Sequence, residues 1–225
     1  MNKYRNKHKG ERCFIICNGP SLTTSDLAQL KDEITFGTNR IYLASFVPTY
    51  YAIEDHLVME DNAAEIDALD CVKFVPDDLA EHLTRHAEYV NMRYEYSEGL
   101  PEFSKNLDVE VFSGGTVTYF CLQLAYWMGF SEVYLIGLDH SYVIPDGAEE
   151  VSHNIYLSNG SDPNHFDAEY FGNGKRFHTP NTKRMEKAYR KAKAAFRGRV
   201  IANASRKTKL NVFKKVSFDD LFTAS

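Results

Sequence analysis

Residues 12–22 read RCFIICNGPSL, and this stretch decides the fold. Within Arg12–Cys17, the five residues after Arg12 are apolar at consecutive positions, which is typical of a strand buried on both faces of a parallel sheet. The strand runs directly into Asn18-Gly19-Pro20-Ser21, where Gly19 permits a tight turn and Pro20 fixes the backbone. In an α/β protein a helix follows such a turn, and its N-terminus favours an anion. The stretch therefore predicts the first strand–loop–helix unit of a ligand-binding α/β domain.

Apolar runs of the same kind recur along the chain and alternate with helical patterns. We expect further strands at 34–37, 49–53, 71–75, 132–136 and 199–202, and helices at 25–31, 56–69, 77–86, 116–128 and 180–196. This alternation predicts one Rossmann-like α/β domain with a mostly parallel sheet and helices on both faces. A polar, aromatic stretch at 93–108 and a long loop-like insert at 140–178 interrupt it. An insert of that length is typical of a lid or a binding element.

Composition limits the class of protein. The chain has 225 residues, which suits one domain at 12–225 behind a basic, flexible arm at 1–11. Hydrophobic residues make up 44%, which excludes disorder as the main state, and the net charge of −5 argues against a nucleic-acid binder. The four cysteines form no CxxC pair and no apolar run has the length of a membrane helix, so we expect a cytoplasmic protein. Peripheral contact of the arm with the inner membrane, and assembly into a homo-oligomer, stay open.

Candidate binding residues follow the carboxyl ends of the expected strands, where open α/β sheets bind their ligands. The expected nucleotide-binding positions are Asn18, Gly19, Ser21, Asn39 and Asp55, and Arg40 is a candidate for a phosphate. A second backbone-lined pocket, suited to a phosphate or a sugar, is expected at Ser113, Gly114, Gly115 and Thr116. For each position the alternative is an ordinary turn or a helix cap.

Candidate catalytic residues lie later in the chain. His178 stands just before an expected helix, and an imidazole suits a general base that acts on a hydroxyl, although many histidines are only structural. Asp139 directly follows the apolar strand EVYLI, and Tyr142 comes soon after it. Asp139, His140, His165 and His178 are also candidate metal ligands, but their spacing matches no compact ligand set. We therefore expect no required metal or cofactor.

These motifs, in this order, resemble the bacterial lipooligosaccharide sialyltransferases of glycosyltransferase family 42. The resemblance spans about residues 12–205 and is carried by Asn18-Gly19-Pro20-Ser21-Leu22, Thr38-Asn39, Ser113-Gly114-Gly115, Tyr134–Asp139 and His178-Thr179-Pro180-Asn181-Thr182. The Gly-Pro-Ser loop and the glycine-rich loop also resemble the 6-hydroxymethylpterin diphosphokinase MptE-like domain family. The phrases ITFGTNRIY and PTYYAIEDHLV are more similar to that second group.

The sialyltransferase resemblance implies a GT-A-variant fold and an inverting, metal-independent transfer from a CMP-sugar donor to a glycan acceptor in surface-polysaccharide biosynthesis. It implies that Asn18, Ser21 and Asn39 hold the nucleotide and that the Gly114–Gly115 loop lies beside the donor. His178 would take the acceptor proton, and Tyr142 or Tyr156 would bind the departing phosphate. The chain departs from the family after the third strand, where Glu54-Asp55 replaces an asparagine. Two acids there predict repulsion of an anionic donor carboxylate.

Two other functions compete with this one. The first is a diphosphokinase that transfers diphosphate from ATP to an alcohol, with Mg²⁺ held by carboxylates such as Glu54, Asp55 and Asp139. No lysine-bearing phosphate loop supports it. The second is a nucleotide-binding domain without catalytic activity. Metal dependence separates the first alternative from a sialyltransferase-like enzyme, and binding without turnover would favour the second.

Overall fold

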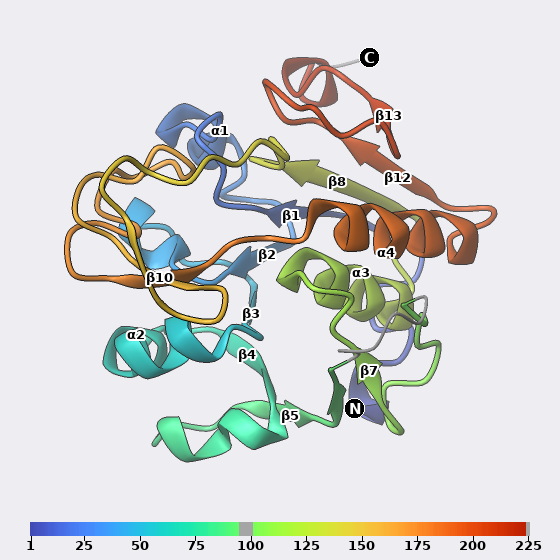
Figure 1. The fold of residues 1–225 in the computed structure, drawn as a ribbon. Coiled ribbons are helices and arrows are strands. Elements are labelled where there is room, and N and C mark those ends of the chain that lie inside the picture. The colour runs from blue at the N-terminus through green and yellow to red at the C-terminus, as the bar shows by residue number, and fades with distance from the viewer. Residues whose placement is uncertain (95–100, 224–225) are drawn as a thin grey trace.

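A central sheet of eight parallel strands organises the molecule (Figure 1). This computed structural model describes residues 1–94 and 101–223. The strand order is β13-β12-β8-β1-β2-β3-β4-β5. The strands are β1 (Arg12–Ile16), β2 (Thr35–Thr38), β3 (Tyr50–Ala52), β4 (Val72–Pro76), β5 (Glu88–Val90), β8 (Glu132–Ile136), β12 (Val200–Asn203) and β13 (Lys214–Lys215). The predicted Rossmann-like α/β fold with a parallel sheet is confirmed.

The chain changes direction across the sheet at β1. From β1 it adds β2, β3, β4 and β5 on one side, and it later returns to add β8, β12 and β13 on the other. β1 therefore has β2 and β8 as its two neighbours, and Ile16 pairs with both Gly37 and Ile136. Such a switch leaves a crevice at the carboxyl ends of the two central strands, and ligands of open α/β sheets bind there.

In the described residues, four α-helices cover the two faces of the sheet (Figure 1). One face carries α1 (Thr24–Gln29) and α2 (His56–Ala68), and the other carries α3 (Val117–Met128) and α4 (Thr182–Ala195). The continuous apolar run of β1 serves both cores, because Phe14 and Ile16 pack on the α1–α2 side while Cys13 and Ile15 pack on the α3–α4 side. Within the described residues, no helix has both the length and the apolar character that a membrane crossing requires.

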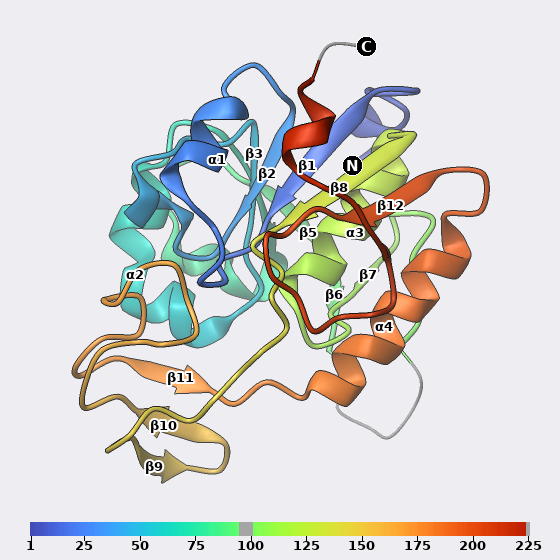
Figure 2. The same cartoon turned by 90° about the horizontal axis from the view of Figure 1, so that it is seen from above.

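The insert at 140–178 has more regular structure than its sequence predicts. It contains an antiparallel sheet of β9 (Glu149–Ser152), β10 (Ile155–Leu157) and β11 (Arg176–His178), so the expectation of a loop is wrong for these segments. All of β9 is exposed, which explains why no apolar alternation marks it. Figure 2 shows the insert projecting from the end of the molecule where β11 leads into α4.

Short irregular elements complete the fold. The helix expected at 77–86 is only a 3-10 helix, η3 (Asp77–His82); the others are η1 (Asn2–Tyr4), η2 (Ile41–Ala44) and η4 (Asp219–Leu221). The polar stretch at 93–108 lies beside a two-stranded sheet of β6 (Met92–Arg93) and β7 (Val111–Phe112), and its residues 95–100 lie outside the described residues.

The basic N-terminal segment packs against the domain, whereas the sequence predicts a flexible arm at 1–11. Tyr4 is 5% exposed, and its ring contacts Tyr50 and Phe74 in the α3–α4 core. Backbone groups of residues 6, 8 and 10 donate to carbonyls at the end of α3, and Trp127 Nε1 donates to the Met1 carbonyl. The buried Tyr4 side chain holds the segment in place. The sequence does not predict this burial, because Tyr4 is a lone aromatic residue among basic ones.

Candidate functional site

Two adjoining cavities lie at the carboxyl ends of β1, β2, β3 and β8, and the insert forms part of their walls. The outer chamber has a volume of about 450 Å³, and the inner chamber has a volume of about 90 Å³. Residues of both chambers meet at a junction formed by Asn39, Thr116, Val117, Tyr142, Asn164 and His165. The cavities therefore occupy the crevice at the topological switch, as the parallel sheet requires.

The loop after β1 packs against the loop after β8. A Cβ on Gly19 would lie 2.5 Å from the Gly137 carbonyl oxygen and 2.9 Å from Asp139 Cγ. The Asp139 carboxylate accepts hydrogen bonds from Ser21 N at 2.7 Å and from Ser21 Oγ. Gly19 is thus required for a close approach of two loops. Ser21 does not line either chamber. Its N–H and its hydroxyl instead bond Asp139.

Two asparagines that line the chambers each have a buried side-chain oxygen without a hydrogen-bond partner in the described chain. Asn18 is 8% exposed, and its Nδ2 donates to Thr38 O at 3.1 Å and to Thr38 Oγ1 at 2.9 Å. These bonds leave Asn18 Oδ1 buried without a partner in the part of the chain that the structure describes, and Asn39 Oδ1 is in the same situation. Asn39 adopts a positive φ of 47°, a conformation that asparagine tolerates better than most residues. A ligand with N–H or O–H donors would satisfy these acceptors.

Glu54 carries less charge than its sequence suggests. Its Oε1 accepts from Ser113 Oγ at 3.2 Å, while Oε2 is buried without a hydrogen-bond partner in the described chain. Burial raises the pKa of Glu54 well above its usual range, and the Ser113 bond only partly opposes this shift. Glu54 is therefore held as the neutral acid more readily than an ordinary glutamate. The sequence predicts two negative charges at Glu54-Asp55. In the structure, burial instead favours the neutral form of Glu54 beside Asp55.

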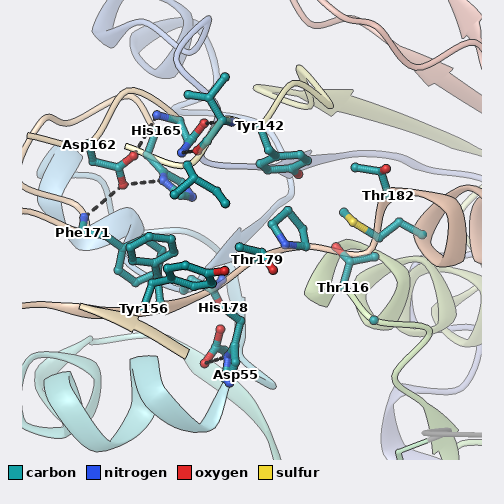
Figure 3. A pocket seen from close by; sticks show the side chains of 18 of the residues that line it. Asp55, Thr116, Tyr142, Tyr156, Asp162, His165, Phe171, His178, Thr179 and Thr182 are labelled. Atoms are coloured by element: carbon teal, nitrogen blue, oxygen red, sulfur yellow. Dashed lines mark hydrogen bonds and ion pairs between the residues drawn. The ribbon is translucent and has the colours of Figure 1, made fainter. Parts of the chain in front are cut away.

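Asp55 and His178 form an ion pair at the wall of the outer chamber (Figure 3). Asp55 ends the loop after β3 and caps α2, since its Oδ1 accepts from Val58 N at 3.2 Å. His178 is the last residue of β11, and its Nδ1 lies 3.9 Å from Asp55 Oδ1. The interaction with Asp55 raises the pKa of His178, and partial burial opposes it. An imidazole with a carboxylate behind it is the arrangement of a general base and its orienting group.

In the glycine-rich loop before α3, some residues line the chambers and others support the loop from behind. Ser113 Oγ bonds Glu54 and accepts from Gly115 N at 3.1 Å, so it acts behind the chamber wall. Gly114, at a φ of 58°, packs against the Tyr119 ring, where a Cβ would lie 2.4 Å from Cδ1. Only Gly115 and Thr116 line the chambers. They lead into α3, whose N-cap Thr116 makes no side-chain capping bond, so the first N–H groups of the helix face the junction without a side-chain acceptor.

The segment after β8 forms one side of the inner chamber. Burial raises the pKa of Asp139, while its two bonds from Ser21 oppose that rise. His140, at a φ of 52°, is 8% exposed and lies 3.5 Å from the Glu186 carboxylate. Burial lowers the pKa of His140 despite this neighbour. Tyr142 lines both chambers, and its ring meets His140 edge-on. The position of Tyr142 suits a ligand contact better than that of Asp139, whose catalytic role stays a prediction.

Arg40 fastens the insert to the sheet and does not line either chamber. Arg40 is 7% exposed, and its guanidinium donates to the Glu169 carbonyl at 3.0 Å, to the Tyr170 carbonyl and to Tyr42 Oη at 3.0 Å. Phe166 N also donates to the Asn18 carbonyl at 2.9 Å. Arg40 therefore holds the insert through Nε and Nη1, and its candidate role at a phosphate stays a prediction.

The insert also brings a second imidazole–carboxylate pair to the site, which the sequence reasoning did not find. His165 Nδ1 lies 2.7 Å from Asp162 Oδ2, and the His165 ring stacks on Tyr170 with a centroid distance of 3.8 Å. Asp162 is 5% exposed and also accepts from the backbone of Asn164 and Phe171. Burial favours the neutral acid, but these hydrogen bonds prevail and lower the pKa of Asp162. The only sequence signal is an Asp-x-x-His spacing in a polar loop, which is too common to be informative.

Most of the predicted site residues come together around these chambers. Those that line them are Asn18, Gly19, Asn39, Asp55, Gly115, Thr116, Asp139, Tyr142 and His178. Ser21, Ser113 and Gly114 lie behind the walls and hold the loops in place.

Comparison with known proteins places the chain in a family. A protein-family model described as 6-hydroxymethylpterin diphosphokinase MptE-like matches residues 1–145. The chain belongs to this MptE-like family. The match covers the sheet through β8 and ends within the segment that carries Tyr142, so His165 and His178 lie beyond it. The resemblance to the MptE-like family that the sequence motifs indicate is confirmed.

A solved structure is similar to this MptE-like chain over almost its whole length. It is the MAf glycosyltransferase from Magnetospirillum magneticum AMB-1, with a TM-score of 0.57 and 14% sequence identity. The alignment covers 96% of this chain and 35% of that protein, so the chain spans about a third of the neighbour's length. At this identity the likeness shows a shared fold. No curated protein matches the chain.

The carboxylates near the site do not form the ligand set that a diphosphokinase requires for Mg²⁺. In the described parts of the chain, no three His, Cys, Asp or Glu side chains gather as a metal-binding group. Asp139 is bonded to Ser21, Glu54 is biased towards its neutral acid, and Asp55 caps α2 and faces His178. Mg²⁺ prefers ionised oxygen ligands in near-octahedral geometry. The residues present do not fit such an ion.

Proposed function

We propose that this MptE-like protein is a glycosyltransferase of surface-polysaccharide biosynthesis, which transfers a sugar from a CMP-activated donor to a hydroxyl of a glycan. The observation that carries the proposal is the Asp55–His178 pair on the wall of the 450 Å³ chamber at the carboxyl edge of the sheet. The glycosyltransferase fold neighbour supports the reaction class. The inner chamber, with the unsatisfied Asn18 Oδ1, suits a nucleoside that offers amino and hydroxyl donors.

His178 acts as the general base in this proposal. Its imidazole takes the proton of the acceptor hydroxyl while the acceptor oxygen forms a bond to the anomeric carbon. The bond from that carbon to the donor phosphate breaks, and its electron pair stays on the phosphate oxygen. Attack on the face opposite the leaving group inverts the anomeric centre. Asp55, a positioning residue behind His178, stabilises the imidazolium that forms.

The leaving phosphate requires donors that are already in place. The N-terminus of α3 supplies N–H groups and a favourable dipole at the junction of the chambers. Tyr142 lines the same junction, and its hydroxyl is the proposed partner of a phosphate oxygen. Donors fixed before the reaction need not reorganise as charge develops. Because burial biases Glu54 towards its neutral form, an anionic donor meets less repulsion than two charged acids would cause.

A Mg²⁺-dependent diphosphokinase is the second candidate, because the matching family model carries that description. The poor fit of the carboxylates to Mg²⁺ weighs against it. A thermal-shift panel separates the two candidates. It uses CMP, CDP, UDP, GDP and ATP, each with EDTA or with Mg²⁺. A ligand at 100 times its Kd adds about 2.7 kcal/mol, which raises Tm by roughly 5–10 °C in a protein of this size.

We expect CMP to stabilise the protein in EDTA. Stabilisation only by ATP with Mg²⁺ would overturn the proposal in favour of a diphosphokinase. Once a donor is found, His178→Gln should lower the transfer rate about 10²–10⁴-fold, the usual contribution of a general base, with CMP binding retained. His153→Gln is the matched control, because His153 lies exposed in the same insert and lines neither chamber. Full activity of His178→Gln would contradict the assignment of the base.

A further inference from the structure

Asp162 and His165 form an imidazole–carboxylate pair on a different wall of the outer chamber from Asp55 and His178 (Figure 3). The His165 ring is fixed in position because it stacks on Tyr170 with an interplanar angle of 2° and meets Phe171 edge-on. Asp162 holds Nδ1, so Nε2 belongs to the opposite edge of the ring, which points into the cavity in Figure 3. Three acceptor contacts fix Asp162 itself.

The junction of the chambers favours an anion but holds few cations. None of the residues that line the two chambers in the described chain is a lysine or an arginine. The donors that the lining offers to an anion are the first N–H groups of α3, a helix of 12 residues, and the imidazole N–H groups. His178 lines only the outer chamber and His140 only the inner one, whereas His165 lines both. His165 is thus the one imidazole of the described lining that reaches the junction.

A second observation indicates that a ligand occupies this region. Asn18 is 8% exposed, and its Oδ1 is buried without a hydrogen-bond partner in the described residues of the inner chamber. A nucleoside that satisfies Asn18 in the inner chamber would place its phosphate towards the junction. There the phosphate would meet the first N–H groups of α3 and the edge of His165.

We propose that His165 is a second catalytic residue, which donates a hydrogen bond from Nε2–H to a phosphate oxygen of the leaving nucleotide. This inference rests on the proposed transfer reaction. When the bond between the sugar and the phosphate breaks, its electron pair stays on the phosphate oxygen, and the hydrogen bond from His165 Nε2–H stabilises that charge without a change of covalent bonds. Asp162 is a positioning residue, because its carboxylate bonds His165 Nδ1 and orients the ring.

Two substitutions separate this role from a structural one. Asn at position 165 can keep the bond to Asp162 but offers no donor at the Nε2 position, whereas Gln reaches further and can restore a donor there. Titration calorimetry with CMP and with cytidine measures the contribution of the phosphate. We expect His165→Asn to weaken CMP binding roughly ten- to hundredfold, as for a hydrogen bond to a charged group, and to leave cytidine binding unchanged.

His165→Gln should recover part of the CMP affinity, and His153→Asn, in the same insert, should bind both ligands as the wild type does. In transfer assays His165→Asn should lower kcat and leave the acceptor KM unchanged. Equal loss of CMP and cytidine binding, or no loss of either, would overturn the assignment. The assignment would also be overturned if His165→Asn kept its CMP affinity while His165→Gln lost it, because that result marks a purely structural histidine.

The same measurements distinguish this inference from the proposed function. If wild-type protein binds CMP and His165→Asn binds it equally well, the His165 assignment fails and the CMP-sugar transferase stands. If wild-type protein binds ATP with Mg²⁺ and not CMP, the proposed transferase fails, and the comparison of ATP with adenosine then tests His165 in the same way. Absence of binding by every nucleotide of the panel would overturn both.

Discussion

At the scale of single residues, Asp55 has two tasks that can be separated. Its Oδ1 caps α2 through Val58 N, and its carboxylate raises the pKa of His178. Asn caps a helix about as well as Asp, so Asp55→Asn keeps the first task and removes the second. We expect the pKa of His178 in this variant to fall relative to the wild type, as followed by NMR titration of the imidazole nitrogens. Asp70→Asn, an exposed site at the end of the same helix, is the control.

The raised pKa of His178 sets the direction in which stability and activity change with pH. The pair stabilises the fold below the ordinary histidine pKa of about 6.5, and this stabilisation is lost as pH rises through the folded-state pKa. In transfer assays the acid limb of the pH profile should lie above pH 6.5 for the wild type, because the base must be unprotonated. It should shift to lower pH in Asp55→Asn. An unchanged His178 titration in the variant would show that the ion pair is absent in solution.

At the scale of elements, the β1 and β8 loops act as one unit because Gly19 lets them touch. A Cβ at position 19 would meet backbone and a carboxylate already bonded to Ser21, so the neighbours have no easy way to yield. We expect Gly19→Ala to destabilise the protein by about 1–3 kcal/mol, the usual range for overpacking. Urea denaturation measures this difference. Gly160→Ala is the matched control, because a Cβ there meets no atom within 4 Å, and equal stability of the two variants would contradict the account.

The elements also show what the sequence could predict. The buried strands β1, β3 and β8 contain runs of consecutive apolar residues, so their pattern was sufficient. β9 is fully exposed and β13 has only two residues, so neither leaves a periodic signal. Strand ends predicted which loops line the site. They could not predict that Ser21 binds Asp139, because that contact joins two loops far apart in the sequence, or that Asp162 holds His165, because that contact depends on the local fold of the insert.

At the scale of the whole molecule, Arg40 connects the sheet to the insert that closes the site. Its guanidinium reaches the Glu169 and Tyr170 carbonyls across the domain. Arg40→Met keeps the length of the side chain but removes these donors. We expect chymotrypsin to cleave the insert faster in this variant, at aromatic residues such as Phe166 and Phe171. Arg190→Met, on the exposed face of α4, is the control. An unchanged cleavage rate would mean that other contacts hold the insert.

The central position of β1 has a consequence for how the chain is made. Arg12 pairs with Glu132, so one edge of an early apolar strand gains its partner only about 120 residues later. At a synthesis rate of 5–20 residues per second, that edge waits roughly 6–24 s on the ribosome. The ligand-binding crevice cannot exist before then, and the nascent strand must be shielded from other chains meanwhile. Production of this protein should therefore depend more on chaperones and translation speed than its well-packed native state suggests.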